Sequence, residues 1–261
     1  MNLKGISLYF GYGFPIGENE KLIKKHNFDC IITTRDNKFD FQNGKLNQQV
    51  MICKKLGLKL SSLHMSYYGK DLTKFWEYGK DGDELEKSLI LDVKAAYKYG
   101  FSCVVVHLVG KKSKIGLERI KRILAYCEKY SIPLAIENIG HFSIMKYVFD
   151  NIDSPFLKLC FDIGHQNVFE KNKDILSAYG DKLICLHLHS NMGEKDEHTL
   201  AKYGNINWTS FAKCIAKINP NINLDYEIFM STRHCDSAED VLSEIYKEAC
   251  NLEKMIEKYA K

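Results

Sequence analysis

The feature that most constrains the fold is a short apolar run that recurs eight times along the 261 residues. The runs are rich in β-branched and aromatic residues and cover residues 5–10, 29–33, 58–64, 102–108, 133–137, 157–163, 183–189 and 223–229. Runs of this texture are typical of buried parallel strands. Their spacing of roughly thirty residues matches one strand followed by one helix, so the sequence predicts eight such units.

The segments between these runs have a helical pattern. In residues 84–99, 117–130 and 238–259, apolar side chains return every three or four positions with Lys and Glu between them. This period is typical of an amphipathic helix that covers a core. Gly57 and Gly100 are placed where a helix C-cap is expected.

Strands that alternate with helices indicate an α/β fold with a parallel sheet, and eight units in about 250 residues favour a closed barrel. A doubly wound open sheet is the alternative. However, residues 10–15 lack the third glycine and the helix start of a dinucleotide-binding turn. The four prolines and the absence of a Ser- or Gly-rich stretch give no sign of a linker. We therefore predict a single (β/α)8 TIM barrel domain over residues 1–261.

Potential metal ligands follow the predicted strands. They are His64, His107, Glu137, Asp162, His165, His187, Asp196, His198 and Glu227. In a parallel barrel the residues just past the strand C-termini converge on one face, where active sites lie. A lone histidine there is often structural, and a lone carboxylate is often in a salt bridge. Burying the unpaired charge of Glu137 or Glu227 is costly, however, and a cation would offset that cost. Mixed imidazole and carboxylate ligands suit Zn, Mn, Fe or Co rather than Ca.

The charge pattern argues against strong binding of nucleic acid. The net charge of +4 arises from 37 basic and 33 acidic residues. The basic stretch 111–114 follows the fourth predicted strand; it is compatible with a phosphate, but a solvated loop is the favoured interpretation. Of the four arginines, Arg35 and Arg233 alone are expected on the active face.

Two further features bear on the compartment. No apolar stretch reaches the roughly 18 residues of a membrane span, and the first residues lack a signal-peptide core, so a cytoplasmic protein without membrane contact is expected. The nine cysteines are scattered, and we expect those within strand runs to be buried as small hydrophobic residues; these are Cys30, Cys103, Cys160 and Cys185.

Taken together, these residues resemble the xylose isomerase-like barrels, a superfamily that joins sugar isomerases and epimerases with endonuclease IV, a zinc enzyme that cleaves DNA at abasic sites. The resemblance covers nearly the whole chain. It rests on Glu137-Asn138, on residues 161–165 (Phe-Asp-Ile-Gly-His), 187–191 (His-Leu-His-Ser-Asn), 196–198 (Asp-Glu-His) and 204–208 (Gly-Asn-Ile-Asn-Trp), and on Glu227.

The resemblance implies ligand sets that differ between the two branches. In the isomerase branch one divalent metal is bound by Glu137, Asp162, His187 and Glu227, the two glutamates also move protons, and His165 contacts the sugar. In the endonuclease branch the same four ligands join His64, His107, His165, Asp196 and His198 around three zinc ions. One to three ions per chain, Zn or Mn, are therefore expected.

The motifs divide between the branches. Residues 64–67 (His-Met-Ser-Tyr) resemble the endonuclease pattern, whereas residues 7–12 (Ser-Leu-Tyr-Phe-Gly-Tyr) do not resemble that pattern, which has a histidine and a serine there. Residues 201–204 (Ala-Lys-Tyr-Gly) also replace the Gly-x-Gly that is common after the seventh strand.

We therefore predict a metal-dependent isomerase or epimerase of a small sugar or sugar phosphate, with Glu137 and Glu227 as catalytic groups that exchange a proton with carbon. The substrate-binding residues expected are Tyr9, Tyr67, His165, Trp208 and Arg233. The alternatives are an endonuclease IV-like multi-zinc phosphoesterase, for which DNA would be the partner, and a non-catalytic metal-binding barrel. The sequence is compatible with an oligomer.

Overall fold

The computed structural model describes residues 2–35, 46–229 and 237–260. The strands are β1 (Lys4–Ser7), β2 (Cys30–Thr34), β3 (Lys59–His64), β4 (Cys103–Val106), β5 (Leu134–Glu137), β6 (Leu157–Asp162), β7 (Leu183–His187) and β8 (Leu224–Tyr226). The α-helices are α1 (Glu18–Lys25), α3 (Leu46–Lys55), α4 (Lys80–Tyr99), α5 (Lys114–Tyr130), α6 (Phe142–Asn151), α7 (Ile163–Phe169), α8 (Ile175–Tyr179), α9 (Trp208–Ile218) and α10 (Ala238–Tyr259). Short 3-10 helices are η1 (Leu72–Trp76), η2 (Gly180–Lys182) and η3 (Ala201–Tyr203).

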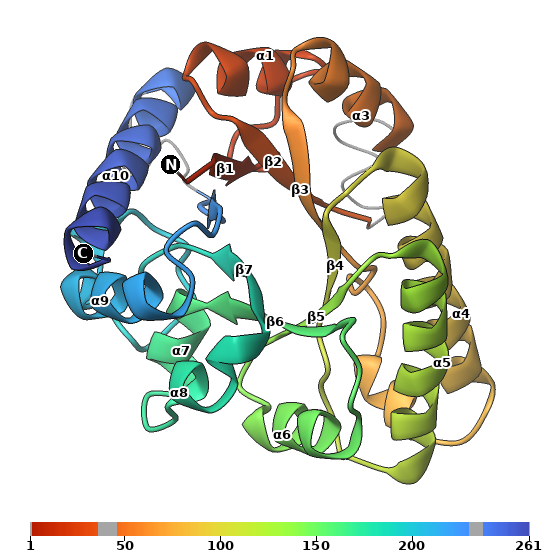
Figure 1. Ribbon diagram of the computed structural model, residues 1–261. Helices are drawn as coiled ribbons and strands as arrows, with labels where there is room; N and C mark the ends of the chain where they lie inside the picture. The colour runs from red at the N-terminus through yellow and green to blue at the C-terminus, as the bar shows by residue number, and fades with distance from the viewer. Residues whose placement is uncertain (1, 36–45, 230–236, 261) are drawn as a thin grey trace.

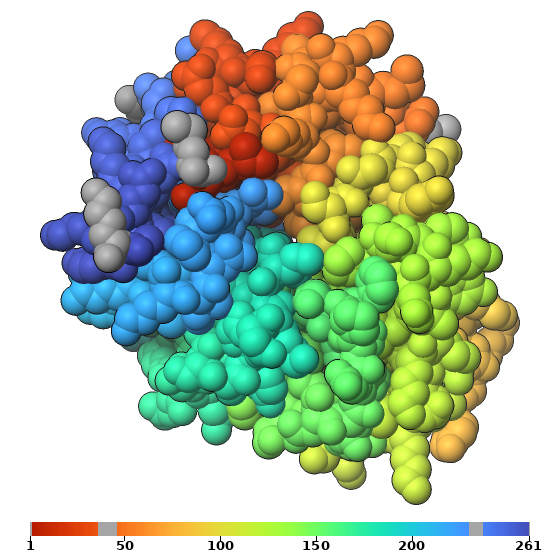
Figure 2. Space-filling model, viewed as in Figure 1, coloured from red at the N-terminus to blue at the C-terminus, as the bar shows by residue number. Residues whose placement is uncertain are grey.

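The strands form one parallel sheet in the order β7-β6-β5-β4-β3-β2-β1-β8. The barrel closes between β8 and the extension of β7. There the Leu188 N–H donates to the Asp225 carbonyl at 2.9 Å, and the Glu227 N–H donates to the Leu188 carbonyl at 3.0 Å. The helices surround the strands, and the last helix, α10, lies beside the first, α1 (Figures 1 and 2). The predicted (β/α)8 TIM barrel is confirmed.

The helices match their predicted ends better than their predicted starts. Helices α4 and α5 end at the predicted residues, and Gly100 takes the left-handed conformation at φ 84. Both begin three or four residues earlier than the apolar pattern indicates. The first turn of α4 is polar and gives no apolar signal. For α5 the start is fixed by the Ser113 side chain, which accepts a hydrogen bond from the Gly116 N–H.

Most strands are shorter than the apolar runs. The ladders of β4, β7 and β8 end at Val106, His187 and Tyr226, although the apolar pattern continues for two or three more residues. Beyond these points the regular ladder stops but the chain stays buried, as at Leu108, and Leu188 forms a single bridge to β8. Apolar patterning reports burial rather than pairing, which explains the difference.

The barrel interior is packed with small and medium side chains, and the four strand cysteines are buried as predicted. Three of them, Cys103, Cys160 and Cys185, form one cluster with Val105 and Ala135 inside the barrel.

Within the described ranges of the chain, no helix combines the length and hydropathy that crossing a bilayer requires.

Candidate metal centre

Four strands end on a potential metal ligand. His64, Glu137, Asp162 and His187 are the last residues of β3, β5, β6 and β7. All four side chains are buried. Because the strands are parallel, their C-terminal ends open on one mouth of the barrel, and the predicted convergence of these residues is found.

Glu137 lies at the centre of this convergence and is only 2% exposed. Its Oε2 lies 3.0 Å from Nε2 of His107 and 3.2 Å from Nε2 of His64. Its Oε1 lies 3.1 Å from Nδ1 of His187 and 3.3 Å from Nδ1 of His165. Although burial alone would raise it, the pKa of Glu137 is held well below its usual range by the imidazoles, His187 foremost. One ionised carboxylate therefore joins two groups of ligands.

The first group consists of His64, His107 and Glu137. The Nε2 atoms of the two rings lie 3.0 Å apart. Ligands in a tetrahedral shell with bonds of about 2 Å are about 3.3 Å apart, so three atoms at these separations fit around one ion. Burial and the neighbouring His64 ring lower the pKa of His107, which favours the neutral imidazole that binds metals.

The second group consists of Glu137, Asp162, His187 and Glu227. Oε2 of Glu227, just past the end of β8, lies 3.1 Å from Nδ1 of His187. Burial would raise the pKa of Glu227, but His187 lowers it to about 2. Nε2 of His187 is buried without a hydrogen-bond partner.

The third group lies on the other side of Asp162 and contains His165, Asp196 and His198 together with His189. Oδ2 of Asp196 lies 3.2 Å from Nε2 of His165 and 3.0 Å from Nε2 of His198. Nδ1 of His198 lies 2.6 Å from the Glu227 carbonyl oxygen, to which it is placed to donate. A bond of this kind fixes the ring orientation and leaves Nε2 directed at the site, an arrangement typical of metal-binding histidines. His198 also has a positive φ of 48°, a conformation that is uncommon for residues other than glycine.

His189 is the site residue that the sequence analysis missed. Its ring is fully buried, its Nε2 lies 3.1 Å and 3.2 Å from the two carboxylate oxygens of Asp162, and it stacks on the His198 ring at 3.8 Å. A Cβ at position 164 would collide with this ring, so Gly164 leaves the space that His189 fills. The available signal was the spacing, since residues two apart in an extended segment share a face and His187 was already a candidate.

The three groups have the chemistry of a cation site. Their carboxylates are Glu137, Asp162, Asp196 and Glu227, and within the described ranges the positive partners at hand are imidazoles. Burial opposes charge on the His187 ring, yet Glu137 and Glu227 raise its pKa well above its usual value. The mouth therefore favours positive charge, which a divalent cation supplies as well as imidazolium does. The residues present fit one or more such ions.

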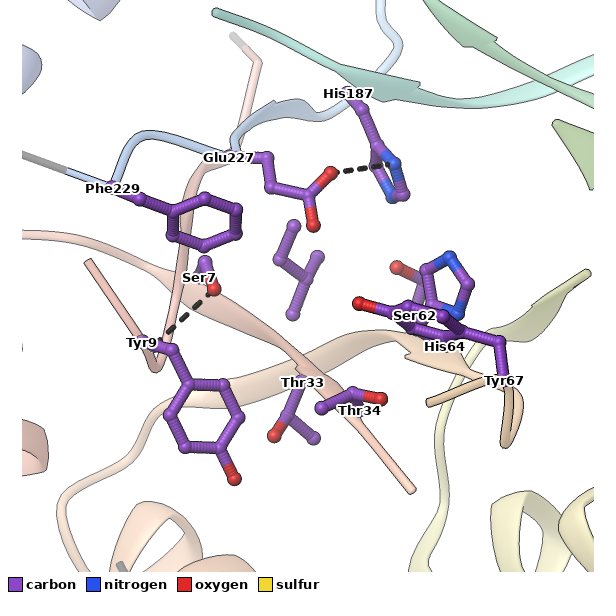
Figure 3. A pocket seen from close by; sticks show the side chains of 11 residues that line it. Ser7, Tyr9, Thr33, Thr34, Ser62, His64, Tyr67, His187, Glu227 and Phe229 are labelled. Carbon is purple, nitrogen blue, oxygen red and sulfur yellow. Dashed lines mark hydrogen bonds and ion pairs between the residues drawn. The ribbon is translucent and has the colours of Figure 1, made fainter. Parts of the chain in front are cut away.

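A small cavity opens beside the second group. It is lined by Ser7, Tyr9, Ile32, Thr33, Thr34, Ser62, His64, Tyr67, His187, Glu227 and Phe229. Figure 3 shows Glu227 and His187 on one side of this cavity, and Tyr9, Thr33 and Thr34 on the opposite side. Ser7, Thr33, Thr34, Ser62 and Phe229 were not predicted.

The predicted substrate-binding residues do not all reach this cavity. Tyr9 and Tyr67 line it. His165 lies instead in the third ligand group, and Trp208 begins α9 and packs edge-on against Phe211 at 5.9 Å. Arg233 lies outside the described residues.

The basic candidates on this face are also outside the cavity lining. Lys111 and Lys112 are exposed, as expected for a solvated loop. Nε of Arg35 lies 3.7 Å from Asp92. Among the parts of the chain that the structure describes, no lysine or arginine lines the cavity.

Comparisons with known proteins agree with this architecture. The family model described as "Xylose isomerase-like TIM barrel" matches residues 21–250. Uncharacterized protein y4fM of Sinorhizobium fredii is 30% identical over 139 residues, which cover 51% of this chain and 44% of that protein. The chain spans about half the length of the curated relatives it matches.

Solved structures show the same fold. A D-tagatose 3-epimerase-like protein superposes with a TM-score of 0.80 at 17% identity and covers 100% of both chains. The 3-keto-D-glucoside 4-epimerase from E. coli superposes with a TM-score of 0.71 at 14% identity, covering 95% of this chain and 100% of the other.

Proposed function

This chain belongs to the xylose isomerase-like TIM barrel family, and we propose that it is a divalent-metal-dependent isomerase or epimerase of a small sugar. The observation that carries the proposal is the position of Glu227. Its carboxylate belongs to the second ligand group and also lines the cavity. A single group thus connects a cation site with a space for a small molecule, as proton transfer at a metal-bound sugar requires.

Glu227 is suited to accept a proton from carbon. Although burial raises it, the pKa is lowered to about 2 by the contact with His187 and the charge of His198 together, so the side chain is an ionised carboxylate at neutral pH. Among the described residues that line the cavity it is the one carboxylate. In the proposed isomerisation Glu227 takes a proton from the carbon next to the substrate carbonyl and returns it to the carbonyl carbon, while the proton of the adjacent hydroxyl passes to the former carbonyl oxygen. In an epimerisation the same carbon would receive a proton on its opposite face from a second donor.

Glu137 has a different role in this proposal. Both of its oxygens face imidazole nitrogens at 3.0–3.3 Å, and it does not line the cavity. We infer that it anchors the ligand groups, although the sequence suggested that both glutamates move protons. A Zn or Mn ion held by Glu137, Asp162, His187 and Glu227 would polarise the substrate carbonyl when bound.

The aromatic residues of the cavity complete the site. Tyr9, Tyr67 and Phe229 form apolar surfaces that can stack on the C–H faces of a sugar. They also reduce the access of water to the reacting carbon, which limits loss of the abstracted proton to solvent.

The proposal is tested by deuterium exchange. Metal-loaded protein is incubated in D2O with a panel of aldoses, ketoses and their phosphates, and NMR measures deuterium at the carbon next to the carbonyl. We expect exchange with at least one sugar, and a loss of about 10²–10⁴-fold in Glu227→Gln, the usual contribution of a positioned base. The exposed Lys112→Ala variant is the control. Full exchange in Glu227→Gln would refute the assignment.

A multi-zinc phosphoesterase is the second candidate, because the first and third ligand groups give this chain more potential ligands than one ion requires. Elemental analysis of protein purified without chelator separates the candidates. About three zinc ions per chain together with nicking of abasic DNA would favour the phosphoesterase. One ion per chain with carbon-bound exchange would favour the isomerase.

A further inference from the structure

One wall of the cavity is made of hydroxyl side chains from three neighbouring strands. They are Ser7 of β1, Thr33 and Thr34 of β2, and Ser62 of β3, which are 4%, 4%, 8% and 1% exposed. Three of these hydroxyl oxygens, those of Thr33, Thr34 and Ser62, have no hydrogen-bond partner. The fourth, Oγ of Ser7, accepts from the Tyr9 N–H at 3.2 Å and keeps its own proton to donate.

Unpartnered hydroxyls at this depth reduce the stability of the folded chain. A buried polar group without a partner costs free energy that an apolar group of the same shape would not. Valine has the shape of threonine and suits a strand at least as well. Three such hydroxyls gathered on one wall are therefore accounted for when a bound molecule supplies the missing partners.

The sheet is irregular where these hydroxyls gather. Ile31 of β2 pairs with Leu60, but Thr33 pairs with Leu63, so β3 contains one extra residue between the two pairs. As a result, successive side chains of β3 both reach the interior: Ser61 donates to Asp225 at 2.5 Å, and Ser62 lines the cavity. Irregularities of this kind re-aim side chains near active sites.

We propose that this hydroxyl wall, formed by Ser7, Thr33, Thr34 and Ser62, binds the distal hydroxyl groups of an uncharged, open-chain polyol. The inference rests on the proposed function, because the same cavity would hold the reacting carbon beside Glu227. Thr33 and Thr34 lie across the cavity from Glu227 and His187 (Figure 3), so an extended substrate places its carbonyl end and its distal hydroxyls at opposite ends.

The chemistry of the wall decides between a free sugar and a sugar phosphate. Neutral hydroxyls both donate to and accept from the hydroxyls of a polyol. A phosphate has only acceptor oxygens and two negative charges, and it is usually bound by Arg, Lys or backbone N–H groups. Within the described residues the lining of this wall has no cationic side chain. The substrate end that meets the wall is therefore not phosphorylated.

The test uses alditols, linear polyols without a carbonyl, which can occupy the cavity but cannot react. Binding of xylitol and sorbitol to the metal-loaded protein is measured by calorimetry, and the Tm is measured without ligand. For Thr33→Val we expect alditol binding weakened about tenfold, which corresponds to the loss of one hydrogen bond. We also expect an unchanged or higher Tm, since the variant removes an unpartnered buried hydroxyl.

A residue with a purely structural role would not show weaker alditol binding together with an unchanged or higher Tm. Ser62→Ala is the second variant and keeps the test decisive if Thr33→Val folds poorly. Thr73→Val is the matched control, because the Thr73 hydroxyl donates to Asp71 at 2.5 Å outside the cavity. It should leave alditol binding unchanged.

Three results would overturn the inference: no alditol binding, a lower Tm with unchanged affinity in both wall variants, or tighter binding of sorbitol 6-phosphate than of sorbitol. Failure of the proposed function has a different signature. In that case alditols bind with the predicted dependence on Thr33 and Ser62, but no sugar of the panel exchanges deuterium.

Discussion

The two halves of the barrel mouth are built from different chemistry. The half formed by β4 to β8, together with His64 at the end of β3, contains carboxylates and imidazoles that contact one another, so that each oxygen of Glu137 faces two rings. The half formed by β1 to β3 contains hydroxyls without partners, as at Thr33 and Ser62. In the first half the carboxylates have positively charged partners within the protein, namely the imidazole rings. The second half is incomplete without a molecule from outside.

The largest effect is expected from Glu137→Gln, which tests whether the charged half depends on one shared carboxylate. The amide is neutral, and its NH2 group would face ring nitrogens on one side. We expect loss of bound metal and a fall in deuterium exchange of about 10³-fold or more. Elemental analysis and NMR are the measurements.

The exposed Glu118→Gln variant is the control for Glu137→Gln. Glu118 forms an i,i+3 pair with Lys121 on α5, and this substitution should change neither metal content nor exchange. Normal metal content in Glu137→Gln would show that the ligand groups are independent of one another.

The charged half could be predicted from the sequence, because carboxylates at the ends of apolar strands are costly to bury and therefore conspicuous. Glu137 and Asp162 follow runs with little other polarity. The eightfold spacing predicted the barrel for a similar reason, since burial leaves a strong pattern. In both cases burial has a large energetic effect, so single residues in the sequence reveal it.

The hydroxyl half could not be predicted in this way. Serine and threonine occur on both faces of strands at little cost, so Thr33 and Ser62 have no local signal. Their importance arises from the irregular pairing of β2 with β3, which depends on two segments about thirty residues apart. His189 was missed for a related reason: its role depends on the space beside Gly164, which lies in the first turn of α7 after another strand, β6.

The second prediction concerns the packing of that ring. In Gly164→Ala the new Cβ would meet a buried histidine that is stacked on His198 and cannot move aside. We expect a loss of about 1–3 kcal/mol in the free energy of unfolding, measured by urea denaturation. Gly13→Ala is the control, because a Cβ there meets nothing within 4 Å.

The double variant Gly164→Ala, His189→Ala tests the cause of that loss. If the collision is responsible, the double variant should be more stable than the sum of the two single effects predicts. Strict additivity would mean that Gly164 and His189 act independently, and that the third ligand group is not held by their contact.

The third prediction examines the boundary between the two halves, where His64 both belongs to the first ligand group and lines the cavity. In a one-metal isomerase, His64→Ala should lower exchange by no more than about tenfold and leave the metal of the second group in place. A loss as large as that of Glu137→Gln would instead assign His64 to an essential ion, and would favour the phosphoesterase. Metal content and exchange rate are measured on the same sample.

The smallest effect is expected from a partly buried carboxylate outside the mouth, which tests whether imidazoles are what keep the mouth carboxylates ionised. Burial raises the pKa of Glu248 from 4.5 to about 7, although hydrogen bonds from the Ala201 N–H and the charge of Lys202 oppose the shift. The folded chain then binds more protons than the unfolded chain between these two pKa values, so stability falls as the pH rises from about 4.5 to about 7. Glu248→Gln cannot lose a proton and should reduce this fall by roughly 1 kcal/mol, as measured by urea denaturation at pH 5 and pH 8.

An identical pH dependence in the wild type and the variant would mean that burial alone does not raise a carboxyl pKa in this fold. The low pKa of Glu227 would then need no imidazole to explain it, and the contrast between the two halves would lose its electrostatic basis.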